Sequence, residues 1–301
     1  MSLSSEQIEQ FNSDGYVLLR GALKDGDVDP VIGEYEEYID RYAHELKAEG
    51  KIDNLHQDEP FERRLAQICR QNDEIYAHLD IMHFRGRASF EFLGNDNLID
   101  MVECLVGSEI MCSPIQHTRA KLPTGLTPGD NDAHVAAWHQ DAGVAWEEAD
   151  PHFILTVWLP LVAATPENGC LQIIPRTHGR GLVEHVTRVG VGTIITDEEL
   201  LAQEALTMPM EKGDVLLLHK EIPHRSTPNH SDMVRWSMDL RYQKTGTPTG
   251  RPFYPDFVVR SRENPDLVLT DYDEWCRMWV AGLEEAKKVQ RPSHRWQVVE
   301  G

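Results

Sequence analysis

Apolar residues recur every three or four positions through the first third of the chain, with acidic residues between them. This spacing predicts an amphipathic helix with one buried face at residues 26–50, and two or three more helices between residues 60 and 106 that stop near Gly107. A shorter helix precedes residues 16–19, an apolar run that predicts a strand. We therefore expect residues 1–107 to form a helical N-terminal buttress.

The pattern changes after Gly107 to short β-prone runs separated by turn signals such as Asn168-Gly169. The runs span residues 110–112, 115–119, 153–159, 170–175, 208–210, 215–219 and 234–242. Helices followed by short strands predict a mainly β protein with N-terminal helices, built on an antiparallel double-stranded β-helix, the cupin-like jelly-roll barrel.

The barrel core is expected at about residues 108–245, interrupted by a loop at 123–132 and by a long excursion at 176–205 with a small helix near its end. The C-terminal extension at 246–301 is rich in proline and then helical at 274–288. No internal repeat or polar linker divides the chain. We interpret residues 1–301 as one domain.

Composition narrows the class of protein. The chain carries 29 basic and 50 acidic residues, a formal net charge of −21, which argues against nucleic acid or an anionic membrane as a partner. The five cysteines form no Cys-x-x-Cys pair, which favours a reducing compartment. Neither a signal peptide nor an apolar stretch long enough for a membrane span is visible. We expect a cytoplasmic protein whose oligomeric state the sequence does not indicate.

The candidate chemistry centres on Trp138-His139-Gln140-Asp141. In a strand, residues i and i+2 point to the same face, so His139 and Asp141 can present an imidazole and a carboxylate side by side. With one more histidine they form the facial triad that holds Fe(II) and leaves positions open for a cosubstrate and O2. His-x-Asp also occurs at His56, His78 and His230, but only His139 precedes a run of strands.

Two histidines compete for the third ligand position, because His219 and His224 both follow the predicted strand at 215–218. Pro223 keeps the backbone extended before His224, so that this side chain can face the barrel interior from a strand end. We predict His139, Asp141 and His224 as the metal ligands, and His219 as a core or supporting histidine.

A 2-oxoglutarate cosubstrate would bind the iron through one end, which leaves its far carboxylate for the protein to hold. Arginine suits that task because its guanidinium can hold a carboxylate with two parallel hydrogen bonds. Arg235 lies on the strand after His224, and Ser226 lies on the ligand's own strand. We predict that these two residues bind the cosubstrate.

The motifs that follow one another along residues 5–245 resemble the phytanoyl-CoA dioxygenase family, which includes ectoine hydroxylase. The resemblance rests on the opening Gln7–Leu18, Trp138–Asp141, Thr156–Trp158, Asn168–His178, His224–Asn229 and Arg235. It implies a double-stranded β-helix, Fe(II) bound by His139, Asp141 and His224, and 2-oxoglutarate held by Arg235 and Ser226. It also implies that Trp158 lies near the cosubstrate, and that one polar residue among Gln116, Arg119 and Lys121 contacts it; of these we take Gln116.

One departure from the family pattern is visible. The family commonly has Pro-Gly-Ser-His where this chain has Pro175-Arg176-Thr177-His178, so a bulky cation replaces a glycine beside the expected mouth of the site. The carboxylate ligand Asp141 is retained, which disfavours the halogenating relatives that lack it.

The most consistent function is that of an Fe(II)/2-oxoglutarate-dependent dioxygenase that uses O2 to hydroxylate a C–H bond of a small molecule and converts 2-oxoglutarate to succinate and CO2. Two alternatives are a cupin-like metalloenzyme that does not use 2-oxoglutarate and a metal-free jelly-roll binding protein. The sequence does not identify the substrate, nor does it distinguish hydroxylation from desaturation or demethylation. Arg176, Arg241 and His134 could meet an anionic group, and Trp146 an apolar one.

Overall fold

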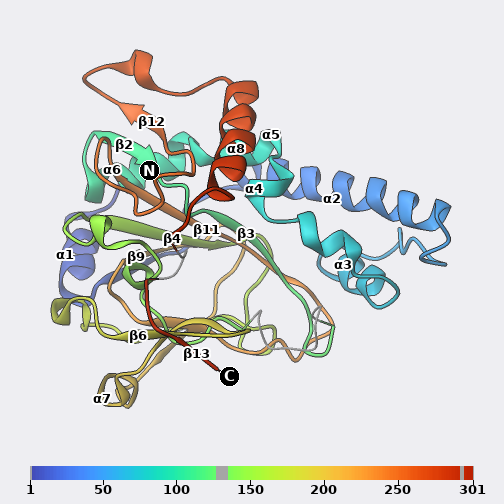
Figure 1. Cartoon of the computed structure of the whole chain (residues 1–301), viewed down its shortest axis with the longest axis horizontal. Coiled ribbons are helices and arrows are strands. Elements are labelled where there is room, and N and C mark those ends of the chain that lie inside the picture. The colour runs from blue at the N-terminus through green and yellow to red at the C-terminus, as the bar shows by residue number, and fades with distance from the viewer. Residues whose placement is uncertain (1, 127–134, 292–294, 301) are drawn as a thin grey trace.

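The computed structural model describes residues 2–126, 135–291 and 295–300 (Figure 1). Its α-helices are α1 (Ser5–Asp14), α2 (Asp25–Ala48), α3 (Phe61–Cys69), α4 (Ile81–Phe84), α5 (Arg87–Leu93), α6 (Asp96–Val106), α7 (Glu198–Leu201) and α8 (Tyr272–Ala286). Its short 3-10 turns are η1 (Glu74–His78), η2 (Asp141–Gly143), η3 (Glu147–Ala149), η4 (His178–Arg180) and η5 (Pro265–Leu267). The expected long helix over 26–50 is confirmed by α2, and Gly107, at φ 96°, ends α6 as predicted.

The strands follow mainly after α6, as the change of pattern indicated. They are β1 (Tyr16–Leu19), β2 (Glu109–Cys112), β3 (His117–Lys121), β4 (Ile154–Pro160), β5 (Leu171–Ile173), β6 (His185–Arg188), β7 (Gly192–Ile195), β8 (Leu206–Met208), β9 (Val215–His219), β10 (His224–Ser226), β11 (Arg235–Lys244), β12 (Phe257–Ser261) and β13 (Val298–Val299). All pairings are antiparallel except that of β13 with β6.

The largest sheet runs β1-β9-β4-β11-β2-β12, with β3 also paired to β11. Its longest strand, β11, alternates strictly between two environments. Trp236 and Tyr242 belong, with the even positions between them, to the main hydrophobic core, whereas Arg235 and Arg241 lie on the opposite face with the odd positions. One face of this strand is therefore structural and the other is polar.

The N-terminal helices cover the apolar face of the large sheet (Figure 1). Trp236 is fully buried between these layers, its ring stacked on Phe61 of α3 at 4.8 Å and lying 5.3 Å from Tyr35 of α2, measured between ring centroids. Aromatic pairs at such distances bury a large apolar area and add about 0.5–1.5 kcal/mol each. The helical buttress thereby fixes the strand that carries the polar face.

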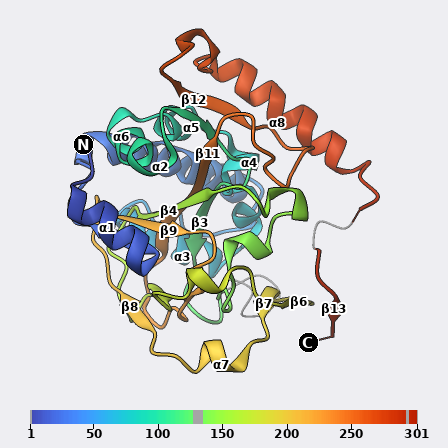
Figure 2. The ribbon, with the colours of Figure 1, turned by 90° about the vertical axis from the view of Figure 1, so that its left-hand side faces the viewer.

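A second layer lies opposite that polar face. It contains the sheet β10-β5-β8 and the sheet β13-β6-β7. Residues 136–140 connect them, because His139 forms an antiparallel bridge with His224 of β10 and the Trp138 carbonyl accepts a hydrogen bond from Ile195 of β7. In Figure 2, β13 lies beside β6 and β7, below α8.

Several expectations need correction. The described strands form three sheets in facing layers, and they do not close into one hydrogen-bonded barrel. The stretch 60–106 holds four α-helices and η1 where two or three helices were expected, and the excursion 176–205 contains the hairpin β6–β7 besides its small helix α7. Among the described residues no helix is both long and apolar enough to cross a membrane.

Candidate metal centre

His139, Asp141 and His224 converge between the two layers, each with a ligand atom within 4.8 Å of the others. The Nε2 atoms of His139 and His224 lie 3.9 and 3.8 Å from the same Asp141 oxygen, Oδ1. The two imidazole rings are 4.3 Å apart between centroids. Two imidazole nitrogens and one carboxylate oxygen around a common point form the donor set of a facial triad, with room for further ligands on the open side.

The local backbone achieves this arrangement in a way that differs from the expected strand. His139 lies in an isolated bridge, Asp141 begins the 3-10 turn η2, and only Gln140 between them is extended, at φ −109° and ψ 140°. One extended residue suffices to place i and i+2 on the same side. Gln140 is itself fixed, since its amide donates to the carbonyls of Gly181 and Glu221.

Hydrogen bonds set which nitrogen each histidine presents. The Nδ1–H of His139 donates to the Ala137 carbonyl at 2.8 Å, and the Nδ1–H of His224 donates to the Ile222 carbonyl at 3.0 Å. A carbonyl can only accept, so each ring carries a proton on Nδ1, which leaves Nε2 as the nitrogen directed at the other two ligands. Backbone partners of this kind orient metal-binding imidazoles and increase their basicity.

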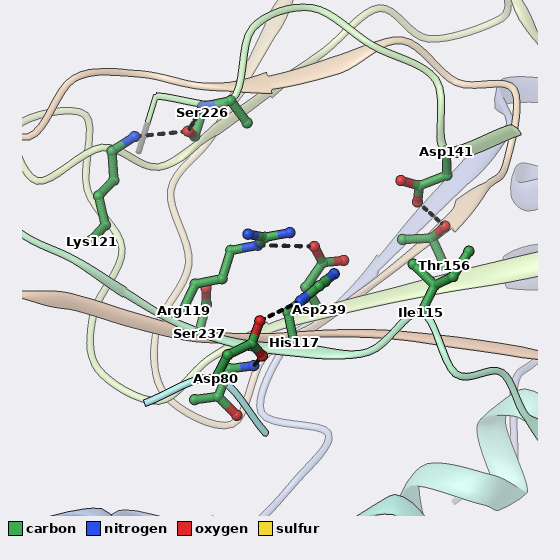
Figure 3. A network of polar contacts seen from close by, with 12 residues as sticks. Asp80, Ile115, His117, Arg119, Lys121, Asp141, Thr156, Ser226, Ser237 and Asp239 are labelled. Atoms are coloured by element: carbon green, nitrogen blue, oxygen red, sulfur yellow. Dashed lines mark hydrogen bonds and ion pairs between the residues drawn. The ribbon is translucent and has the colours of Figure 1, made fainter. Parts of the chain in front are cut away.

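The carboxylate of Asp141 is held from both sides. Thr156 of β4 donates its hydroxyl hydrogen to Oδ2, and the Arg241 guanidinium of β11 donates to Oδ1 at 2.6 Å. Figure 3 shows Thr156 directed at Asp141 from the neighbouring strand. Arg241 is 4% exposed and also contacts Asp239 Oδ1 at 3.1 Å. The sheet therefore fixes the orientation of the one anionic ligand.

The charges of the site shift its protonation equilibria in favour of metal binding. Burial lowers the pKa of His139 to about 4, with the neighbouring His224 adding to the effect. Burial alone would raise the pKa of Asp141, but Arg241 and the two histidines outweigh it and hold that pKa well below its usual range. At neutral pH the site thus offers a neutral imidazole at His139 and an ionised carboxylate, the forms that bind metal.

A cavity of about 530 Å³ opens beside the triad. His139 and His224 line it together with Ser226, Trp158 and Arg235. The rest of its wall comes from η1, α4 and the two residues between them, from β3, β5, β7 and β11, and from residues 136, 137, 144 and 191. Both predicted histidine ligands and most of the predicted cosubstrate residues therefore line one common cavity.

Two cations lie side by side in this cavity. Arg235 pairs across the sheet with Lys121 of β3 and is 3% exposed. Its Nη1 donates to Ser237 and its guanidinium lies over the Trp158 ring, but its buried Nε has no hydrogen-bond partner in the described structure. Burial lowers the pKa of Arg235 to about 10, and repulsion from Arg119 adds to this. An uncompensated buried guanidinium is unfavourable unless an anion joins it, so these residues fit the far carboxylate of 2-oxoglutarate.

Lys121, the cation beside Arg235, also contacts Ser226. Its ammonium donates to Ser226 Oγ at 2.7 Å and to the Thr227 carbonyl, and Ser226 Oγ also accepts from the Ala136 backbone N–H. Figure 3 shows Lys121 and Ser226 reaching toward each other from β3 and β10. Of the three polar candidates before the loop, Arg119 and Lys121 line the cavity and Gln116, our choice, is not among its lining residues.

Other predicted contacts lie elsewhere. His219 packs against Phe153 and His178, away from the triad. Arg241 forms ion pairs with Asp141 and Asp239 and is not available to a substrate. Trp146 is buried against Phe253 and beneath Arg291, outside the cavity wall. The predicted contact by His134 lies outside the described residues.

Arg176 is exposed and does not line the cavity. Its φ of 64° places it in the left-handed region, where glycine is favoured because it has no Cβ. A glycine, which the family commonly has at this position, would suit this backbone conformation, and the arginine adopts it here.

Sequence reasoning missed the supports of Asp141. Thr156 was noted only within a motif, and Arg241 was assigned to substrate. A signal was available for Arg241, which lies six residues after Arg235 on one strand, so that alternation puts it on the same face.

Comparisons with known proteins agree with this architecture. A family model described as phytanoyl-CoA dioxygenase (PhyH) matches residues 11–237, more than half of the chain. Mouse phytanoyl-CoA dioxygenase domain-containing protein 1 is 34% identical over 103 residues, 32% of this chain and 35% of that protein. The alignment thus spans about a third of that relative's length.

Two solved structures share the fold. The non-heme monooxygenase ThoJ superposes with a TM-score of 0.62 at 18% identity, over 93% of this chain and 97% of its own. EctD from S. alaskensis, solved with 2-oxoglutarate and 5-hydroxyectoine, gives a TM-score of 0.53 at 19% identity, over 81% of this chain and 77% of its own. The chain thus shares the fold of these two structures and carries a His-Asp-His cluster between its layers. The chain belongs to the phytanoyl-CoA dioxygenase (PhyH) family.

Proposed function

We propose that this protein is an Fe(II)- and 2-oxoglutarate-dependent dioxygenase that hydroxylates an unactivated C–H bond of a small molecule. The observation that carries the proposal is the cluster of His139, Asp141 and His224. Its two histidines line one cavity with the buried Arg235, for which the described residues provide no ion-pair partner. Membership of the PhyH family supports it. The presence of 2-oxoglutarate in EctD, which shares the fold, is a further support.

In this proposal one group of residues binds the metal and another binds the cosubstrate. The two Nε2 atoms and the Asp141 carboxylate would hold iron, while Arg235, Lys121 and Ser226 would hold the far carboxylate of 2-oxoglutarate beside Trp158. When bound, the iron and 2-oxoglutarate supply the oxidation, in which O2 delivers one oxygen atom to the substrate and one to succinate as CO2 is released. The protein contributes orientation and a wall that limits access of water.

The metal assignment is tested by anaerobic titration of the apoprotein with Fe(II) in the presence of 2-oxoglutarate, following the visible charge-transfer band. The wild-type protein should give the band, and His224→Ala and Asp141→Asn should lose it because each removes one of three ligands. His219→Ala is the matched control, since it removes a partly buried imidazole outside the triad, and it should retain the band. A band of normal strength in His224→Ala would refute the ligand set.

The cosubstrate assignment is tested with Arg235→Gln in the same titration. The variant removes the buried guanidinium that would donate charge-assisted hydrogen bonds to the far carboxylate, so 2-oxoglutarate binding should weaken by roughly tenfold or more. Arg260→Gln, a change to a largely buried arginine on β12 paired with Asp100 and Glu103, should leave that affinity unchanged. Iron binding without any response to 2-oxoglutarate would favour a cupin-like enzyme, and absence of iron binding a metal-free binding protein.

A further inference from the structure

The polar face of the large sheet carries more charge than the metal and the cosubstrate use. On β3, His117, Arg119 and Lys121 alternate onto one face, and Arg119 lies opposite Ser237 of β11. Arg119 and Asp239 line the cavity beside the predicted cosubstrate site, and Asp80 of the helical cover lines it too. Figure 3 shows these side chains gathered between Lys121 and Asp141.

The two acidic side chains of this wall, Asp80 and Asp239, are already paired with donors of the protein itself. Asp80 accepts from His117 Nδ1 at 2.7 Å with one oxygen and from the Thr118 N–H at 3.3 Å with the other. Asp239 accepts from Arg119 Nε with Oδ2 and pairs with Arg241 through Oδ1. Each carboxylate oxygen is therefore engaged by a donor of the protein itself.

Arg119, unlike these carboxylates, still has donors available for a ligand. Its Nε is anchored on Asp239 at 3.3 Å, but its two terminal amino groups have no hydrogen-bond acceptor among the described residues. Its side chain is 50% exposed, whereas that of Asp239 is 13% exposed. The guanidinium is thus anchored through Nε and presents a solvent-exposed, positively charged edge to the cavity. A pair of parallel N–H donors at such an edge suits a carboxylate or a phosphoryl group.

The position of Arg119 relative to the metal site is also fixed. An alternating series of charges runs from Arg119 to Asp239, from Asp239 to Arg241, and from Arg241 to the ligand Asp141. Each link is a contact of 3.3 Å or less. A group bound at Arg119 would therefore be held at a defined place with respect to the iron ligands, which is what selection of one C–H bond requires.

We propose that Arg119 recognises an anionic group, a carboxylate or a phosphoryl-type group, on the primary substrate. The inference rests on the proposed dioxygenase function and names the substrate class for that site. It explains why the cavity of a chain with a net charge of −21 carries a third cation besides Arg235 and Lys121. Local positive charge is needed to attract an anion to such an acidic protein.

The test loads the protein anaerobically with Fe(II) and saturating 2-oxoglutarate, so that Arg235 and Lys121 are occupied. Binding of acetate and of methyl phosphate is then measured by calorimetry, with acetamide as the uncharged counterpart. Arg119→Gln should weaken anion binding by roughly tenfold or more. Arg119→Lys should weaken it by less, because lysine keeps the positive charge but lacks the two parallel N–H donors of the guanidinium. Binding of acetate alone or of methyl phosphate alone would identify which anion the site takes.

The matched control is Arg63→Gln, which removes a partly exposed arginine paired with Glu59 and Asp232 outside the cavity and should leave anion binding unchanged. Equal anion affinity in Arg119→Gln and wild type, or equal binding of acetamide and acetate, overturns the inference. So does a loss of 2-oxoglutarate affinity in Arg119→Gln, which would assign Arg119 to the cosubstrate. Absence of the charge-transfer band in the wild type overturns the proposed function and this inference with it, whereas a normal band without anion binding overturns the inference alone.

Discussion

Arg241 and Asp141 form a buried ion pair, at 4% and 3% side-chain exposure. A buried carboxylate that loses its partner is left as an uncompensated charge, which typically costs about 3–5 kcal/mol. A divalent cation at the triad would supply the missing charge from the other side. A bound metal and Arg241 would therefore both compensate the charge of the same buried carboxylate.

Arg241→Met should accordingly lower the thermal stability of the metal-free protein strongly, and added Fe(II) or Mn(II) should recover more stability in the variant than in wild type. Thermal unfolding with and without metal measures both effects. The double variant Arg241→Met/Asp141→Asn is the control, since it removes the buried charge as well and should regain stability without responding to metal. Equal metal-induced stabilisation in wild type and Arg241→Met would contradict this account.

His185 makes the metal-bearing segment sensitive to pH. Its Nδ1–H donates to the Val183 carbonyl, and its Nε2 accepts from the Gln140 N–H between two triad residues. Burial lowers its pKa from the ordinary 6.5 to about 4. Between these values the unfolded chain binds more protons than the folded one, so the contribution of His185 to stability is present above pH 6.5 and is lost as the pH falls toward 4.

The stability that depends on His185 should therefore decrease by about 2 kcal/mol between pH 7 and pH 5. Urea unfolding of wild type and His185→Gln at both pH values measures it, and the variant should show the smaller decrease. His230→Gln, a change to an exposed histidine, should follow wild type. An identical pH response in wild type and His185→Gln would exclude this histidine as the source.

Single residues could be predicted from the sequence where the chemistry of the site requires a particular type of side chain. His139, Asp141 and His224 were predicted as ligands because a facial triad requires that donor set, and the structure brings them together. Gln116 was chosen over Lys121 without a geometric criterion. The cross-strand register that sets Lys121 beside Arg235 is a tertiary fact, and no local pattern on β3 reveals it.

At the scale of elements, β11 explains how one strand serves both core and site. Its even positions pack against α2 and α3, and its odd positions form the polar face that holds Asp141 and lines the cavity. The alternation was readable from the sequence because the two faces meet such different surroundings. A slip of one residue would bury Arg235 among the helices, so the aromatic contacts of Trp236 also fix the register of the site.

Elements whose pairing depends on distant segments were harder to predict. The strong runs at β4, β9 and β11 were expected within two residues of their observed bounds, because central strands are continuously apolar or strictly alternating. The hairpin β6–β7 was not expected, since its sequence, with Gly190 and Gly192 around the turn, has little apolar periodicity. Its order depends on pairing with β13 and on the Trp138 carbonyl.

At the scale of the whole molecule, residues 295–299 link two parts of the chain beside the site. These two walls are residues 141–150, which begin with the ligand Asp141, and the hairpin β6–β7 at residues 185–195. Arg295 pairs with Asp150, and the Trp296 indole donates to the Gly143 carbonyl at 2.6 Å, two residues after Asp141. The same indole lies 5.1 Å from the His185 ring, and β13 continues into the β6–β7 sheet. Figure 2 shows this segment lying beside β6 and β7, apart from the helical layer.

Trp296→Ala should therefore loosen both walls while the helical layer stays intact, because the indole provides the hydrogen bond to one wall and the ring contact to the other. We expect faster amide hydrogen exchange at residues 141–150 and 185–195, unchanged exchange in α2, and weaker Fe(II) binding. Val298→Ala is the control, since that side chain is 48% exposed and its backbone pairing is retained. Unchanged exchange in both walls would show that the segment lies on the site without stabilising it, and faster exchange in α2 as well would indicate general destabilisation. Faster exchange confined to the two walls would establish that a segment more than 150 residues after Asp141 in the chain helps to hold this ligand in place.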